Sequence, residues 1–136
     1  MESRRPRGIV RALWTLCTPL GIDTLEASES KRRYTQRKRR GVAPLIDVYL
    51  PPGPGPHPSV ILIHGGGFLI GTRTMKPIRY LATRLVQAGF AVAAPDYRLL
   101  FQGGALEEAV EDVSEAFKWW RAQADTYQLD PERIST

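Results

Sequence analysis

Three consecutive glycines, Gly65, Gly66 and Gly67, lie between His64 and Phe68 and are the residues in this sequence best suited to chemistry. They follow a run of four apolar residues that predicts a strand buried in a parallel sheet. Because glycine has no Cβ atom, a ligand can come within hydrogen-bonding distance of the main-chain N–H groups. Such groups suit an anion, or an oxygen that becomes negative during a reaction. The sequence therefore predicts a binding loop for a group of that kind.

A strand–helix–strand unit is expected to position this loop. The apolar run at residues 60–63 predicts the first strand, and a second continuous apolar run at residues 90–94 predicts the next. Between them, apolar residues at helical spacing from 75 to 86 predict a helix with one buried face, which Gly89 ends. A unit of this length is right-handed, so the two strands should be parallel.

Three further segments complete the expected domain. Alternating apolar and polar residues at 46–50 predict a half-buried strand near the sheet edge, followed by a Pro/Gly-rich turn. Apolar spacing predicts a long helix from Leu106 to Trp120, with both of its tryptophans, Trp119 and Trp120, serving packing. Residues 129–136 predict a turn that leads into another strand. The acidic residues in the first turns of the helix are expected to stabilise it and to remain solvated; they are Glu107, Glu108, Glu111 and Asp112.

The positive charge is concentrated before this domain. Residues 1–40 carry 11 Lys/Arg against 4 Asp/Glu, whereas residues 41–136 carry 8 against 10, which predicts a basic N-terminal helix and linker or cap segment followed by the domain. Residues 7–18 predict an amphipathic helix, either docked on its own domain or in peripheral contact with a membrane. Residues 31–40 hold seven positive charges. A solvated strand or linker is the favoured interpretation of this run, and nucleic-acid binding is the disfavoured alternative.

The cysteine content and the hydropathy of the sequence indicate in which cellular compartment the protein is located. Cys17 is the only cysteine, so no disulfide can form within the chain, which fits a reducing compartment. No apolar run approaches the ~18 residues that a membrane span needs. Residues 9–22 follow a basic stretch as in a signal peptide, but Arg11 and Pro19 interrupt them. We therefore expect a cytoplasmic protein.

Four motifs occur in a fixed order between residues 45 and 136. They are His-Gly-Gly-Gly-Phe at 64–68, Pro-Asp-Tyr-Arg-Leu at 95–99, Ala109-x-x-Asp112 followed by the Trp pair, and Asp130-Pro131-x-Arg133-Ile134 before the last strand. In this order they resemble the N-terminal portion of the hormone-sensitive-lipase-like α/β-hydrolase family. The resemblance implies a partial, truncated α/β-hydrolase fold, with a mostly parallel sheet flanked by helices. It also implies esterase- or lipase-like chemistry on ester bonds, with no metal or organic cofactor.

In that family the glycine loop supplies an oxyanion hole, whose N–H groups stabilise the negative oxygen formed when a nucleophile adds to an ester carbonyl. The resemblance maps this role onto the loop from Gly65 to Gly67, with the N–H groups of Gly66 and Gly67 as the expected donors. It does not assign His64 as the catalytic base. We expect His64 to shape the loop through hydrogen bonds instead.

The catalytic triad is not found in these residues. No Gly-x-Ser-x-Gly nucleophile motif occurs, so no nucleophile, acid or base is carried over, and Asp96 and Arg98 are expected to form a structural pair behind the site. We expect the chain alone to be inactive, and a small-molecule ester to be the substrate of a full-length form. Loss of the nucleophile strand would expose an apolar edge at residues 60–63, which predicts self-association.

Two other interpretations stay open. A strand, a glycine loop, a helix and Asp96 after the next strand could form a dinucleotide-binding Rossmann-like domain, although Gly65, Gly67 and Gly71 miss the usual spacing by one residue. A non-catalytic half-fold that binds a partner is the second. A metal site is not expected, because His57 and His64 with one distant cysteine match no ligand spacing.

Overall fold

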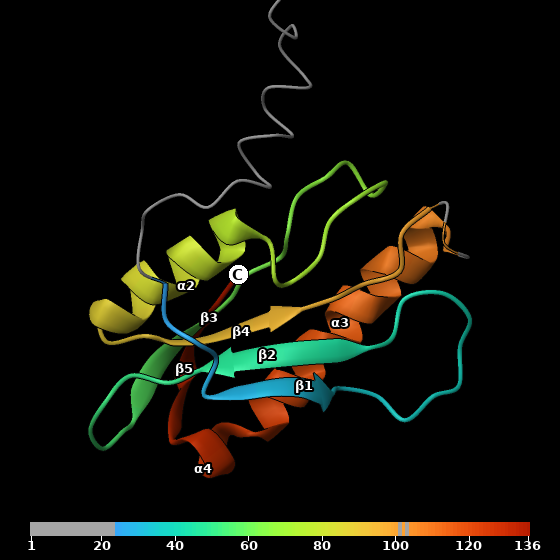
Figure 1. Cartoon of the computed structure of the whole chain (residues 1–136). Helices are drawn as coiled ribbons and strands as arrows, with labels where there is room; N and C mark the ends of the chain where they lie inside the picture. The colour runs from blue at the N-terminus through green and yellow to red at the C-terminus, as the bar shows by residue number, and fades with distance from the viewer. Residues whose placement is uncertain (1–23, 101, 103) are drawn as a thin grey trace, which may run out of the picture.

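The computed structural model describes residues 24–100, 102 and 104–136, so the helix expected at residues 7–18 lies outside the described part. One sheet forms the centre of the domain, with helices packed against it (Figure 1). In chain order the elements are β1 (Glu29–Arg33), β2 (Leu45–Tyr49), β3 (His57–Ile61), α2 (Lys76–Gln87), β4 (Ala91–Pro95), α3 (Leu106–Ala122), α4 (Ala124–Tyr127) and β5 (Leu129–Ser135).

The sheet is mixed, with strand order β1-β2-β4-β3-β5. Strands β3, β4 and β5 run parallel, which confirms the expected strand–helix–strand unit. Strand β2 is antiparallel to both of its neighbours, β1 and β4, so the sheet is mixed, and the expected parallel pairing holds for β3, β4 and β5. The short Pro/Gly-rich connection from β2 to β3 carries no helix, so β2 runs opposite to β3; a parallel arrangement of these two strands would need a longer crossover.

The edge expected at residues 60–63 is partly covered. Strand β5 lies along β3, with Ser59 opposite Ile134 and Val60 opposite Ser135, so β5 is the outer strand on that side. Only the residues that follow Val60 extend past this pairing. Ile63 is accordingly 37% exposed, although its run was expected to be buried on both faces.

Each face of β4 packs against a different helix. One face meets α2 through a cluster formed by Tyr49, Ile78, Ala82, Val86, Val92 and Ala94. The other face meets α3 in a larger cluster that includes Ile46, Val48, Ile61, Ala91, Ala93, Ala116 and Trp120. The indole N–H of Trp120, which is fully buried, donates to Ser59 Oγ at 3.0 Å. Trp120 is therefore a packing residue, as expected, and joins α3 to β3.

The buried face of α3 differs from the expected one at three positions. Leu106 and Val110, expected on the apolar face, are 49% and 60% exposed. Asp112, expected to be solvated, is fully buried. It lies at helical spacing with the buried Ala109 and Ala116, so it occupies the sheet-facing side of the helix. The cause is a pair of arginines outside the helix, described below.

Candidate functional site

The chain leaves the carboxyl end of β3 and forms the glycine loop, residues 64–68. Gly66, Gly67 and Phe68 all have positive φ angles, of 134°, 62° and 62°. A Cβ atom on Gly66 would overlap the carbonyl group of Ile70, whereas one on Gly65 or Gly67 would meet nothing within 4 Å. Glycine is therefore required at position 66 for space, and the other two glycines leave the backbone open to solvent.

The carbonyl groups of the loop are held by hydrogen bonds. Gly66 O accepts from Leu69 N–H at 3.2 Å and from Ile70 N–H at 3.3 Å. Gly65 O lies 3.1 Å from His64 Nδ1, and because a carbonyl oxygen only accepts, Nδ1 carries the proton. A peptide unit is planar with its C=O and N–H pointing in opposite directions, so fixing the oxygen also fixes the next N–H.

The N–H groups of Gly65, Gly66 and Gly67 donate to no other atom among the described residues. All three glycines are exposed. The carbonyl oxygen of a loop peptide accepts a hydrogen bond, and this bond orients the N–H group of the same peptide. The N–H groups themselves remain open to a ligand. An anion or a developing oxyanion is the group that such a set of N–H donors binds best.

His64 lies beneath the loop rather than in the open. It is 2% exposed and stacks on the ring of Tyr97, with ring centroids 4.3 Å apart and planes 12° apart. Burial lowers the pKa of His64 from its ordinary value, so the imidazole is neutral near pH 7. Gly71 makes room for its contact with the loop, because a Cβ there would overlap Nδ1 and lie 2.6 Å from Gly65 O.

Asp96 and Arg98 have different partners, so their expected pairing is wrong. Asp96 accepts from the N–H of Arg73 at 2.6 Å and from the Thr72 hydroxyl at 3.1 Å, and it also pairs with the Arg73 guanidinium. Arg73 in turn donates to Asp47 at 2.9 Å. This buried group ties β2, the end of β4 and the segment before α2 together behind the glycine loop.

Asp112 is the partner of Arg98. Its carboxylate accepts from the Arg98 main-chain N–H and from Nη2, both at 2.8 Å, and also pairs with Arg39. Sequence reasoning missed Arg39 and Arg73 as participants. The one available signal was the position of Asp112 between Ala109 and Ala116 on a face that is otherwise apolar. A carboxylate at such a position requires a buried cation.

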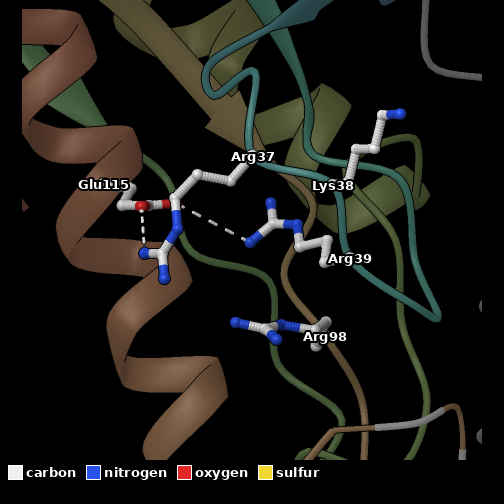
Figure 2. A pocket seen from close by; sticks show the side chains of 5 residues that line it. All are labelled: Arg37, Lys38, Arg39, Arg98 and Glu115. Atoms are coloured by element: carbon white, nitrogen blue, oxygen red, sulfur yellow. Dashed lines mark hydrogen bonds and ion pairs between the residues drawn. The ribbon is translucent and has the colours of Figure 1, made fainter.

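The basic run is partly neutralised by α3. Arg37, Lys38 and Arg39 line a hollow of about 70 Å³ together with Arg98 and Glu115, and dashed lines in Figure 2 join the Glu115 carboxylate to both Arg37 and Arg39. Arg37 Nη1 lies 2.8 Å from this carboxylate. Arg37, Arg39 and Arg98 each pair with a carboxylate of α3. Within this run Arg39 is therefore buried against α3 rather than solvated as expected.

Other chemistry finds little support in the described ranges. They contain no group of three His, Cys, Asp or Glu side chains placed to hold a metal ion. No helix among them has the length and apolar character that crossing a membrane requires. The dinucleotide alternative is not favoured either. Helix α2 begins only at Lys76, several residues past the glycine loop, so its N-terminus does not follow the glycines directly as a pyrophosphate site needs.

A mixed sheet with helices on both faces and a glycine loop after β3 places the chain with the α/β-hydrolase esterases, as their N-terminal portion. The family model BD-FAE matches residues 46–136, about two thirds of the chain. The chain belongs to the BD-FAE family. The expected resemblance to an α/β-hydrolase esterase family is thereby confirmed.

Individual proteins agree with this assignment. The chain is 36% identical to a methylphloroacetophenone synthase of Cladonia uncialis over 83% of its own length and 5% of the synthase. It is 32% identical to a probable isoprenylcysteine alpha-carbonyl methylesterase of Oryza sativa subsp. japonica, over 65% of this chain and 21% of that protein. The thermophilic esterase Est2 of Thermogutta terrifontis, native or butyrate-bound, superposes with a TM-score of 0.69 at 22% identity, covering 80% of this chain and 39% of the esterase. The chain thus spans a small part of the curated relatives it matches.

Proposed function

We propose that this chain is the N-terminal part of a carboxylic-ester hydrolase with a partial α/β-hydrolase fold, and that its glycine loop is the oxyanion hole. The N–H groups of Gly66 and Gly67 are the proposed donors, with Gly65, His64 and Phe68 completing the loop. The observation that carries the proposal is the set of N–H groups that are oriented by bonded carbonyls yet donate to nothing among the described residues.

The proposed chemistry is electrostatic. When a nucleophile adds to an ester carbonyl, the oxygen becomes negative, and donors already in place need no reorganisation to stabilise it. Removing one such donor typically slows catalysis about 10²- to 10³-fold. The nucleophile, acid and base of the reaction are not among these residues, because a triad needs a base within about 3 Å of its nucleophile and no Gly-x-Ser-x-Gly occurs here. We therefore propose that the chain alone is inactive.

The surroundings of the loop support an ester with an apolar acyl group. Several large apolar side chains are exposed on the loop and on its neighbours, namely Ile63, Phe68, Leu69, Ile70 and Leu100. The related proteins whose names state an ester chemistry act as esterases or methylesterases, and the Thermogutta enzyme binds butyrate. A short acyl chain against these side chains, with its carbonyl oxygen on the glycine N–H groups, is the arrangement we propose.

The N-terminal segment has a separate proposed role. Residues 1–40 would form a basic helix and linker or cap, with peripheral membrane contact through residues 7–18 as its testable extension. The lone Cys17 supports a cytoplasmic location. Binding of this chain to anionic-lipid vesicles, compared with a variant lacking residues 1–23, measures the membrane contact directly.

Magnetic resonance of the chain with nitrogen-labelled glycine tests the oxyanion hole without requiring turnover. Butyrate is the probe, because its carboxylate oxygen resembles the oxyanion in charge. We expect saturable shifts of the Gly66 and Gly67 amide signals. Gly53 is the internal control, because it also has a positive φ and open space around it but lies in a different turn. Shifts at Gly66 and Gly67 no larger than that at Gly53, or equal shifts with chloride, would contradict the proposal.

A further inference from the structure

The glycine loop is attached at both ends to the segment that follows β4. The Tyr97 hydroxyl donates to His64 O at 2.8 Å, and the Leu100 N–H donates to Phe68 O at 2.8 Å. These two acceptors are the first and last carbonyl groups of the loop. The three glycines between them have no side chains with which to hold themselves in place. Their conformation therefore depends on contacts from outside the loop.

Tyr97 supplies most of these contacts. Its side chain is almost fully buried, its ring stacks on His64, and the Phe68 ring meets it edge-on with centroids 6.1 Å apart. Burial raises the pKa of the Tyr97 hydroxyl, so the group stays protonated and able to donate throughout the neutral range. One side chain thus contacts the residue before the glycines and the residue after them.

The segment that carries Tyr97 is itself fixed to α3. The N–H of Arg98, the next residue, donates to the buried carboxylate of Asp112 at 2.8 Å. A continuous series of bonds therefore runs from α3 through residues 97–100 to the glycine loop. The orientation of the loop is set by the position of α3 relative to the sheet.

We infer that Tyr97 is a positioning residue of the oxyanion hole, acting through its hydroxyl on the His64–Gly65 peptide. This inference rests on the proposed function of the loop. By holding His64 O, the hydroxyl turns the Gly65 N–H away from the protein interior, since the peptide is planar. It also keeps His64 where Nδ1 can hold Gly65 O, which orients the Gly66 N–H in the same way.

The chain contains a matched control for the loss of this hydroxyl. Tyr34 is equally buried, and its hydroxyl also donates to a main-chain carbonyl, that of Asp96, at 2.7 Å. Tyr97→Phe and Tyr34→Phe therefore each remove one buried hydroxyl and leave one carbonyl without its donor. Tyr34→Phe also removes the acceptor of Arg39 Nη2, which lies 2.9 Å from the Tyr34 hydroxyl, so it is the larger loss of the two. Only the first touches the glycine loop. A purely structural role for Tyr97 predicts the same outcome for both variants.

The experiment compares wild type, Tyr97→Phe and Tyr34→Phe by magnetic resonance of labelled glycine, with and without butyrate. We expect Tyr97→Phe to lower the order parameters of the Gly65 to Gly67 amides and to raise the butyrate dissociation constant about fivefold, the factor expected for one hydrogen bond. Tyr34→Phe should change neither. If Tyr97→Phe and wild type have the same loop order parameters and butyrate affinity, the inference is overturned and the oxyanion-hole proposal stands.

Failure of the proposed function gives a different result. If the wild-type glycine signals do not respond to butyrate, the oxyanion hole is rejected, and the order parameters alone then decide whether Tyr97 positions the loop. If the Tyr97→Phe variant does not fold, a measurement on the wild-type chain tests the inference instead. A hydroxyl bonded to His64 O should exchange slowly with water and give its own proton signal. Absence of that signal overturns the inference.

Discussion

Replacing Asp112 with asparagine removes the charge at the centre of a buried ion cluster while keeping the size of the side chain. The carboxylate is fully buried and is shared by Arg39 and Arg98, whose side chains are 7% and 10% exposed. The asparagine side chain would present one oxygen and one N–H₂ group, so at least one guanidinium N–H would face another donor. Breaking a buried ion pair by removing one partner costs about 3–5 kcal/mol.

The remaining partners of the two arginines decide the magnitude. Arg98 keeps Glu108 at 3.3 Å and Glu111 at 3.2 Å, and Arg39 keeps Glu115 at 3.8 Å. All three glutamates are partly exposed, so they compensate only in part. We therefore expect a loss near the lower limit, about 3 kcal/mol. A chain of this size has a free energy of unfolding of about 7–20 kcal/mol, so the loss is large but leaves a folded majority.

Urea unfolding followed by circular dichroism measures this loss. With a urea dependence of about 2 kcal/mol per molar, a 3 kcal/mol loss lowers the midpoint by about 1.5 M. Glu107→Gln is the control, because it removes an exposed carboxylate from the same helix and should change stability by less than about 0.5 kcal/mol. Equal midpoints for Asp112→Asn and Glu107→Gln would refute the reasoning that the buried carboxylate holds the two arginines.

Three further outcomes follow from the same contacts. Gly71→Ala should shift the glycine-loop amide signals and lower stability by more than about 1 kcal/mol, because its Cβ would overlap His64 and Gly65, and an unchanged thermal melt would contradict this. Since burial lowers the pKa of His64, the unfolded chain binds more protons than the folded chain below about pH 6.5, and the free energy of unfolding should fall as pH drops through that value. The His64→Gln variant should lack this pH dependence of stability, and the same pH dependence in both proteins would exclude His64 as its cause. Strand β5 is an outer strand of the sheet, so sedimentation should show concentration-dependent self-association, and a monomer at every concentration would refute it.

Helices and strands with a regular spacing of apolar residues could be predicted from the sequence. The helix expected at 75–86 is α2 (Lys76–Gln87), and the strand expected at 90–94 is β4 (Ala91–Pro95). Burial explains this success. A helix or strand that packs on one or both faces must carry apolar residues at the matching period, and both segments have helix or sheet neighbours on those faces.

Pairing between distant residues could not be predicted in the same way. Asp96 and Arg98 stand two positions apart and have opposite charges, yet each binds a residue far along the chain, Arg73 and Asp112. The direction of β2 was also beyond the pattern, because alternation reports which face is buried but not which way the strand runs. In both cases the deciding contacts join segments whose separation in the sequence carries no local signal.

The glycine loop shows why these unpredicted contacts matter for the site. Glycine is the residue that lets N–H groups face a ligand, and it is also the residue that loses most conformational entropy on ordering. An oxyanion hole is useful only when its donors are already oriented. The loop therefore needs anchors elsewhere, and the structure provides them through Tyr97 and Leu100 on one segment and Asp112 behind it. A change that loosens this segment should disturb the glycine N–H groups at a smaller cost in stability than is needed to unfold the sheet.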